Sequence, residues 1–238
     1  MKQFFNKQDL EKLKNNLKLK NNESNIEKEL YNRSYKYLKY IKFLPWLLMV
    51  WIWNSIAMNW ATKDSDIDLF IVTTKNTMWI NRIIITFIFS ILWVRKTEKK
   101  HAKMFCLSFF ATTNWLNFNN WKIENDIYLY YWILTFKPII NYNKTYEKFI
   151  LLNEEWVSFD KYQEKIEEDK KYIRYSWNKN NDNKILWFFD KIIKKIFIKK
   201  TYKTYNKIWK PYWIIINDNL LKFHNNDIRK KIKKEILD

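Results

Sequence analysis

The order of apolar and polar residues divides the chain into a mixed first part and a helical second part. Continuous or alternating apolar runs predict buried strands, whereas apolar residues spaced by three and four predict helices with one buried face. The predicted strands are 47–52, 66–73 and 103–112. The predicted helices are one or two within 1–40, then 55–59, 78–92, 127–136, 146–159, 162–175, 185–207 and 227–237.

These elements indicate an α/β (α+β) protein with a small mixed sheet, flanking helices and a helical C-terminal half. We expect N-terminal helices over 1–40, an α/β domain over 41–143 and a helical domain over 144–238. The polar run 178–183 is the clearest linker. One compact unit is the alternative that this chain length permits.

Two aspartates stand at the start of the second predicted strand. Side chains at positions i and i+2 of a strand point to the same side, so Asp66 and Asp68 can bind one cation while Ile67 and Leu69 face the core. Hard divalent cations prefer oxygen ligands and keep positions for water and substrate phosphates. The alternative is a solvated acidic turn that includes Asp64. We favour a metal site because the acidic residues run directly into a strand pattern.

The residues around these aspartates resemble the signature of the DNA polymerase β-like nucleotidyltransferase superfamily, in particular its small bacterial members. The matching runs are Asn54-Ser55-Ile56-Ala57-Met58 and, after a short gap, Asp64-Ser65-Asp66-Ile67-Asp68-Leu69. The resemblance covers residues 40–160 and makes 41–143 the catalytic domain. It implies that Asp66 and Asp68 are catalytic and bind Mg²⁺ or Mn²⁺, and that Ser55 and the adjoining Asn54 bind the phosphates of a nucleoside triphosphate. Asn54 stands where the family usually has glycine.

The activity that the resemblance implies is transfer of a nucleoside monophosphate from a triphosphate such as ATP to an unidentified acceptor, with release of pyrophosphate. Phosphoryl chemistry requires charge neutralisation more than covalent catalysis, so a metal ion held by aspartates suits it. The alternative is a module that keeps the fold without catalysis and binds nucleotide or RNA through its basic surface.

Two further residues are candidates for this site. The family generally takes a third metal-binding carboxylate from the next strand, and 105–110 contains none, so Asp126 is the candidate. The alternatives are a site with only two aspartates, a protein that has lost catalysis, or a plain N-cap role for Asp126. Arg82 lies near the start of a predicted apolar helix and can bind phosphates through its bidentate guanidinium. A solvated Arg82 is the alternative.

The chain is strongly basic, with 44 Lys and Arg against 25 Asp and Glu and a formal net charge of +19. Such a field attracts polyanions, including a nucleoside triphosphate, RNA or an anionic membrane surface. A lysine-rich surface that merely follows from an AT-rich gene is the alternative. The segment 185–199 is apolar on one face and basic on the other, and we expect it to pack on the catalytic domain. Membrane or nucleic-acid binding is its alternative role.

The chain has features of a cytoplasmic protein. Its longest apolar runs, 43–53 and 83–94, are shorter than the roughly 20 residues of a membrane-spanning helix, so we expect no stable membrane insertion. The single cysteine, Cys106, excludes an internal disulfide framework and should lie in the core. Residues 1–20 lack the apolar stretch of a signal peptide. The sequence does not indicate an oligomeric state.

Glycine is absent from the chain, whereas tryptophan occurs 14 times. Ordinary usage would give about 17 glycines in a chain of this length. The abundance of Lys, Asn and Ile indicates an AT-rich gene, in which tryptophan should be scarce. Some bacterial lineages read UGA as glycine, and a translation that reads UGA as tryptophan would write Trp at those positions. A truly tryptophan-rich protein is the alternative.

The placement of the tryptophans favours this miscoding hypothesis. Turns and helix C-termini require positive φ, which glycine adopts without steric cost. Tryptophans at such positions are Trp46, Trp51, Trp53, Trp60, Trp93, Trp115 and Trp121. Those among apolar, helix-like neighbours, which should be authentic and buried, are Trp79, Trp132 and Trp156. We expect Trp53 and Trp60 first to be glycines in the native protein, and some tryptophans to be exposed in loops.

Overall fold

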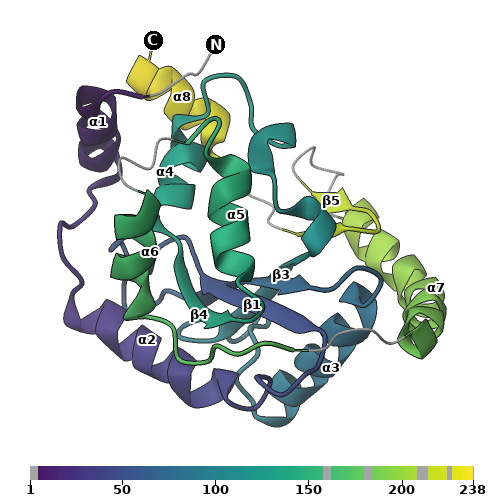
Figure 1. The fold of residues 1–238 in the computed structure, drawn as a ribbon. Coiled ribbons are helices and arrows are strands. Elements are labelled where there is room, and N and C mark those ends of the chain that lie inside the picture. Colours follow the sequence, from purple (N-terminus) through teal and green to yellow (C-terminus); the bar gives the residue numbers. More distant parts are fainter. Residues whose placement is uncertain (1–4, 158–161, 180–183, 208–213, 224–226, 238) are drawn as a thin grey trace.

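The computed structural model describes residues 5–157, 162–179, 184–207, 214–223 and 227–237 (Figure 1). The helices in this part of the chain are α1 (Lys7–Leu17), α2 (Asn25–Leu38), α3 (Met78–Ile91), α4 (Ile127–Thr135), α5 (Thr145–Asn153), α6 (Tyr162–Lys170), α7 (Lys184–Lys207) and α8 (Arg229–Leu237). The strands are β1 (Leu47–Ile52), β2 (Ile67–Thr73), β3 (Phe105–Thr112), β4 (Lys137–Asn141), β5 (Ile215–Ile216) and β6 (Leu220–Lys222).

The strands form one mixed sheet in the order β4-β1-β2-β3-β6-β5. Strands β2 and β3 are parallel, and the other neighbouring strands are antiparallel. A parallel pair needs a long crossover, and α3 supplies it. The predicted α/β (α+β) class is therefore confirmed.

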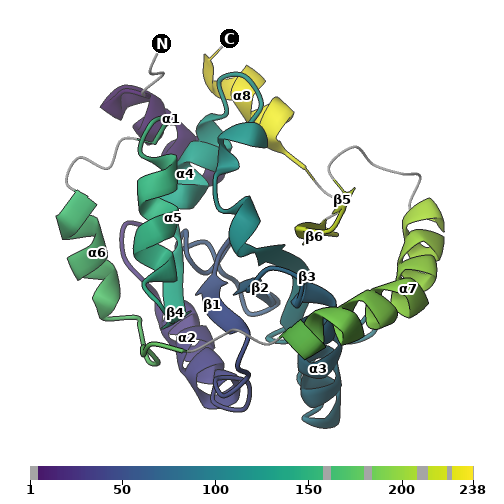
Figure 2. The same ribbon diagram turned by 45° about the vertical axis from the view of Figure 1, so that its right-hand side comes forward.

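Helices cover both faces of the sheet, with α2 and α3 on one face and α4 and α5 on the other (Figure 2). The alternation of side chains along β2 assigns each residue to one of these two layers. Ile67 and Leu69 pack in the layer of α2 and α3, whereas Phe70 and Val72 pack in the layer of α4 and α5. Asp68 shares the parity of Phe70 and Val72, so it points to the α4 side of the sheet.

The first three predicted strands are confirmed, and β1 has the predicted bounds. Strands β4, β5 and β6 were not predicted. Strand β4 begins at Lys137, two residues after the end of α4, and contains Pro138, and β5 and β6 are two and three residues long. So short a strand shows no readable period. The C-terminal part, expected to be helical, therefore also contributes two strands to the sheet.

Three predicted helices differ from the structure. Residues 55–59 form hydrogen-bonded turns instead of a short helix. Helix α5 ends at Asn153, before the predicted end at 159. Helix α6 ends at Lys170 rather than 175, because the next residues run beside β4 and Tyr175 forms a β-bridge with Ile140. Residues 180–183 of the predicted linker lie outside the described part.

Helix α7 packs on α3, as expected for its segment. The backbone N–H of Ile80 in α3 donates a 2.8 Å hydrogen bond to Asp190 of α7, and Ile193 and Phe197 pack against the core. Another side of α7, including Phe188 and Ile196, remains exposed. No helix within the described residues has both the length and the apolar character needed to cross a membrane.

The expected division into buried and exposed tryptophans is confirmed only in part. Those expected to be authentic are buried: Trp79, Trp132 and Trp156. Trp93 is 80% exposed and has φ of 56°, and Trp60 is 39% exposed. At the end of the turn Asn59, not Trp60, has positive φ. Trp51 lies inside β1 and is fully buried, and Trp53 is buried against Phe109. The burial of these two residues gives the miscoding hypothesis no support.

Candidate metal and nucleotide site

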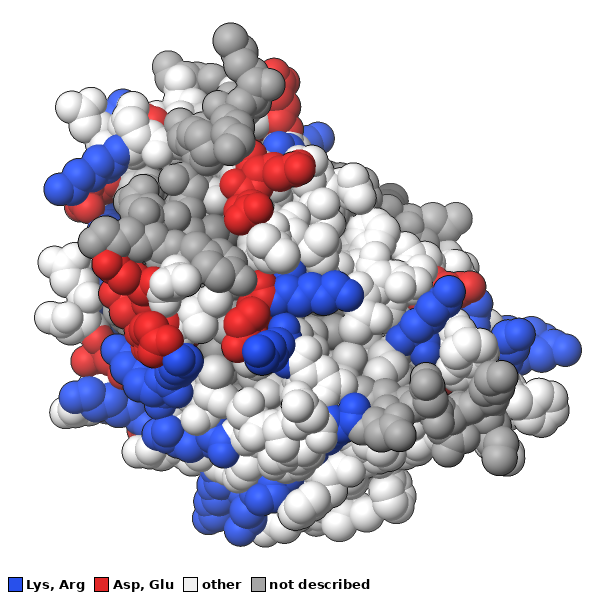
Figure 3. All heavy atoms as spheres, viewed as in Figure 1, with Lys and Arg blue, Asp and Glu red and all other residues white. Residues whose placement is uncertain are grey.

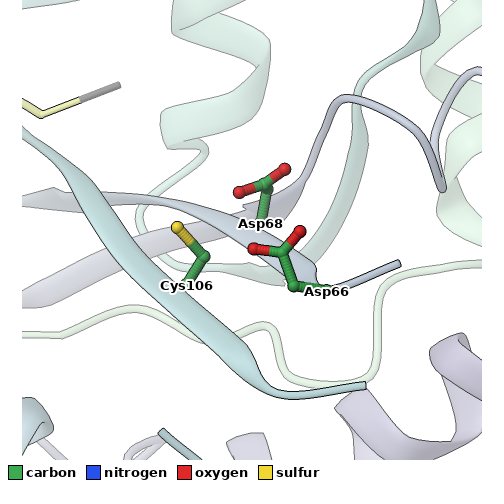
Figure 4. Close-up of side chains that lie close together, drawn as sticks. All are labelled: Asp66, Asp68 and Cys106. Carbon is green, nitrogen blue, oxygen red and sulfur yellow. The ribbon is translucent and has the colours of Figure 1, made fainter. Parts of the chain in front are cut away.

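Asp66 and Asp68 lie on the same side at the N-terminal end of β2, as predicted. The parallel register pairs Asp68 with Cys106 of β3. One ligand atom from each of Asp66, Asp68 and Cys106 lies within 4.8 Å of the other two. Figure 4 shows the two carboxylates and the thiol converging on one space. The three side chains together could hold a metal ion.

Cys106 occupies the corner where a third carboxylate was expected. Its thiol donates to the Ser108 hydroxyl over 3.1 Å, and burial raises the pKa of the thiol well above its usual value. A coordinated cation would reverse this preference, because metal-bound thiols lose their proton. The apolar run around Cys106 predicted only a position in the core. The β2–β3 register that places it beside Asp68 is a tertiary feature, so no local pattern pointed to this role.

The negative charge of Asp66 is partly neutralised by Lys96, which precedes β3. Lys96 Nζ lies 2.6 Å from the Asp66 carboxylate. Burial and the nearby charge of Asp68 raise the pKa of Asp66, while Lys96 partly offsets that rise. Two carboxylates that share one site repel each other, so a cation between them is favourable. Lys96 supplies such a charge to one of the two aspartates.

Asn54 links the turn after β1 to the aspartates. It has φ of 64°, which asparagine tolerates better than most residues and which explains how it can stand in place of glycine. Its side-chain amide donates a 2.9 Å hydrogen bond to Asp68. The adjacent Ser55 carbonyl accepts a 2.7 Å hydrogen bond from Trp60 and closes the turn. The structure therefore brings Asn54 to Asp68, and Ser55 follows Asn54 in the same turn.

Helix α2 fixes the far end of this turn. Ser24 and Glu27 form a capping box at the start of α2. The buried Glu27 carboxylate also accepts a 2.9 Å hydrogen bond from the backbone N–H of Ala61. Both ends of the segment 54–61 are thus held by buried carboxylates, Asp68 at one end and Glu27 at the other.

Asp126 does not complete the metal site. Its carboxylate accepts hydrogen bonds from the backbone N–H groups of Leu129 and Ile123, over 3.0 and 3.1 Å. It also forms a 3.2 Å ion pair with Arg229 of α8. Asp126 is therefore the N-cap of α4 and is not part of the cluster of Asp66, Asp68 and Cys106. The capping alternative was the correct one.

Arg82 belongs to α3, and its side chain packs against residues of the C-terminal part of the chain. Its guanidinium lies 4.6 Å from the centre of the Phe223 ring and donates to the Thr201 hydroxyl of α7 over 3.5 Å. Burial lowers the pKa of Arg82 to about 10. None of its contacts within the described residues reaches the two aspartates or the turn. The predicted phosphate role for Arg82 therefore has no support from this geometry.

Comparison of the chain with protein-family models, with curated proteins and with solved structures finds no match. The resemblance to the nucleotidyltransferase superfamily therefore depends on the residues of the turn and of β2. The hydrogen bond between Asn54 and Asp68 joins these two segments in space.

Proposed function

We propose that this protein is a metal-dependent nucleotidyltransferase that transfers a nucleoside monophosphate from a nucleoside triphosphate to an acceptor. The observation that carries the proposal is the pair of converging carboxylates, Asp66 and Asp68, held beside a tight turn by the side chain of Asn54. A turn of this kind exposes backbone N–H groups that can bind phosphate oxygens, as the nests of other phosphate sites do. The carboxylates and the phosphates would then share one cation.

The donor atoms at this site suit a hard divalent cation. Asp66 and Asp68 supply carboxylate oxygens, which Mg²⁺ and Mn²⁺ prefer, and Cys106 supplies a softer third donor. When bound, such a cation would neutralise charge on the triphosphate and orient it for in-line displacement. Asp66 and Asp68 would hold it, which would release Lys96 from Asp66, and Cys106 would lie beside it as a weaker donor.

The protein groups would then act on the triphosphate. Ser55 and the neighbouring backbone amides would bind the β- and γ-phosphates, and the released Lys96 ammonium would pair with a phosphate oxygen. The acceptor oxygen forms a bond to the α-phosphorus and loses its proton to water, while the bond from the α-phosphorus to the oxygen that bridges it to the β-phosphorus breaks. Pyrophosphate leaves with that electron pair.

A direct test uses each of the four nucleoside triphosphates, labelled at the α-phosphate, with Mg²⁺ or Mn²⁺ and a cell extract as the source of acceptors. We expect one triphosphate to transfer label to a macromolecule or small acceptor and to release pyrophosphate in equal amount. The absence of transfer with every triphosphate and either cation would contradict the proposal.

The second candidate function is a non-catalytic module that binds nucleotide or RNA. Cys106 in place of a third carboxylate and the Lys96–Asp66 ion pair favour it, since Lys96 can replace a cation's charge. The charge of +19 favours a polyanionic partner. On the face in Figure 3, however, basic side chains are scattered and interrupted by acidic groups, which does not indicate one continuous RNA-binding stripe. Binding of nucleotide without pyrophosphate release would identify this module.

The cellular location belongs to the proposal as well. Cys106 is free and buried, which fits a reducing compartment such as the cytoplasm. A nucleotidyltransferase would also find its triphosphate there.

A further inference from the structure

A cavity of about 260 Å³ lies beside the turn of Asn54, on the α4 side of the sheet. Its polar residues are Asn54, Lys222 at the end of β6, Asp227 and Arg229. Its aromatic residues come from α4, from the turn and from the segment before α4: Trp53, Trp60, Trp121, Tyr128 and Trp132. Three segments that are far apart in the sequence, within 53–60, 121–132 and 222–229, thus enclose one space.

The cavity is connected to the aspartates through two side chains. The Tyr128 hydroxyl donates to the Asn54 side-chain oxygen over 3.4 Å, and the Asn54 amide donates to Asp68 over 2.9 Å. Burial and the charge of Asp68 raise the pKa of Tyr128, so its hydroxyl remains a donor. A ligand that contacts Tyr128 in the cavity is therefore connected to Asp68 through the side chains of Tyr128 and Asn54.

The lining combines flat apolar rings with a charged end. Tyr128 and Trp132 present aromatic rings from successive turns of α4, and neither is a position where glycine is expected. At the opposite end, Arg229 holds Asp227 through hydrogen bonds of 2.9 and 2.5 Å, and Lys222 is 95% buried beside them. Flat rings favour a planar aromatic ligand, and the charged groups offer partners for hydroxyl and amino groups.

The volume limits what the cavity can hold. Pockets for drug-sized ligands have roughly 300–1,000 Å³, so about 260 Å³, with tryptophan at positions 53, 60 and 121, accommodates one ring system with a small substituent and not a complete triphosphate. Glycine at these positions would widen the cavity and leave Tyr128 and Trp132 in its wall. The phosphates of a nucleotide would have to lie outside it, and Asp66, Asp68 and Ser55 are the groups beyond Asn54.

We propose that this cavity binds the nucleoside part of a substrate, with its base against Tyr128 and Trp132 and its polar groups toward Lys222 and Asp227. The proposal deepens the nucleotidyl-transfer function and depends on it for the position of the phosphates. The nucleoside can belong to the triphosphate itself or to a nucleotide acceptor, since both have the same chemistry.

Equilibrium dialysis of the full chain with labelled adenosine, guanosine, cytidine and uridine, without metal, tests the cavity alone. We expect one nucleoside to bind best. Tyr128→Leu should weaken its binding by about tenfold or more, the scale of a lost base–aromatic contact. Lys222→Met, which removes a polar partner, should also weaken it. Tyr40→Leu, which removes an exposed ring at the end of α2, is the matched control and should bind like the unmodified protein. If Tyr128→Leu does not fold, Tyr128→Phe tests the hydroxyl alone.

Competition between the bound nucleoside and the triphosphate with Mg²⁺ shows whether the cavity binds the nucleoside of the triphosphate or that of the acceptor. Displacement of the nucleoside identifies the cavity with the base of the triphosphate, and simultaneous binding identifies it with the acceptor; both support the proposal. Failure of all four nucleosides to bind at millimolar concentration, or equal binding by the cavity variants, overturns it.

Asp66→Asn distinguishes failure of the cavity from failure of the proposed function, because it should lose pyrophosphate release and keep nucleoside binding. Nucleoside binding without turnover under any condition would contradict the nucleotidyl-transfer function alone. Turnover that is unaffected by the cavity variants would contradict the cavity alone.

Discussion

The side-chain amide of Asn54 donates a 2.9 Å hydrogen bond to the carboxylate of Asp68. This contact joins the turn after β1 to strand β2. Asn54 makes the contact with a left-handed backbone, which has φ of 64°. One residue thus meets a conformational requirement and a hydrogen-bonding requirement together.

The two requirements can be separated by substitution. Asn54→Gly keeps the backbone conformation and removes the hydrogen bond, whereas Asn54→Ala removes both. Because left-handed backbone costs a non-glycine residue about 1–2 kcal/mol, we expect Asn54→Ala to be less stable than Asn54→Gly by about 1 kcal/mol in urea unfolding. Both variants should bind Mn²⁺ more weakly than the unmodified protein. Equal stability of the two variants would show that the turn does not require positive φ.

Asp66→Asn and Asp68→Asn should each abolish metal-dependent nucleotidyl transfer while the protein remains folded. Each change removes a charge that would bind the cation, and losses of this kind are about 10²-fold to 10³-fold or larger. Asp64→Asn makes the same chemical change outside the cluster and should cost much less. Label transfer and circular dichroism would be measured together. Substantial activity in Asp66→Asn or Asp68→Asn, or an equal loss in Asp64→Asn, would contradict the site assignment.

Lys96→Met should strengthen divalent-cation binding. The Lys96 ammonium, 2.6 Å from Asp66, competes with a cation for that carboxylate. We expect a dissociation constant for Mn²⁺ about two- to fivefold lower, the scale of a partly exposed ion pair. Lys103→Met is the matched control, since Lys103 pairs with Glu29 over the same 2.6 Å and the two lysine side chains are similarly exposed. Activity should nevertheless fall in Lys96→Met if the ammonium binds phosphate during turnover.

Trp93→Gly should stabilise the protein. Trp93 follows α3 with φ of 56°, and its N–H and that of Val94 bond to the carbonyls of Ser90 and Phe89, as in a Schellman motif. Glycine is preferred at this position, and the 80% exposed indole loses little packing. We expect a gain of up to about 1 kcal/mol in the free energy of unfolding. Trp187→Gly within α7 should instead cost about 1 kcal/mol, because glycine is unfavourable inside a helix.

Mass spectrometry of the native protein decides whether the written tryptophans are translated as glycine. We expect glycine in peptides that span positions 53, 60 and 93. Tryptophan at both 53 and 60 would refute the hypothesis for the turn after β1, and tryptophan at 93 would leave the strained helix end as a real feature.

Lys222 should make stability depend on pH. Burial lowers the pKa of Lys222 to about 8 from 10.5, so between these values the unfolded chain binds more protons than the folded one. The free energy of unfolding therefore rises with pH from about 8 to about 10.5, by at most about 3 kcal/mol from this group. Lys222→Met should flatten this rise in urea titrations at several pH values. An unchanged pH profile would show that Lys222 titrates normally in the fold.

The sequence by itself determined several local elements of this protein and the side of the strand on which the two aspartates lie. The apolar run 47–52 and the acidic start of the next strand predicted β1, β2 and the facing of Asp66 and Asp68, because the period of a strand is set by its backbone. Asn125 and Asp126 before an apolar run predicted the start of α4, and capping is likewise a local interaction.

The tertiary structure decided which distant residues meet. Cys106 joins the aspartates only because β3 pairs in parallel with β2 in one register. Asp126 lies outside this cluster, at the N-terminus of α4, where it pairs with Arg229 of α8. Lys222 and Asp227 reach the cavity only because β6 is held by β3. Each of these contacts spans many residues and depends on strand register and helix packing, which the spacing of residues along the chain does not encode.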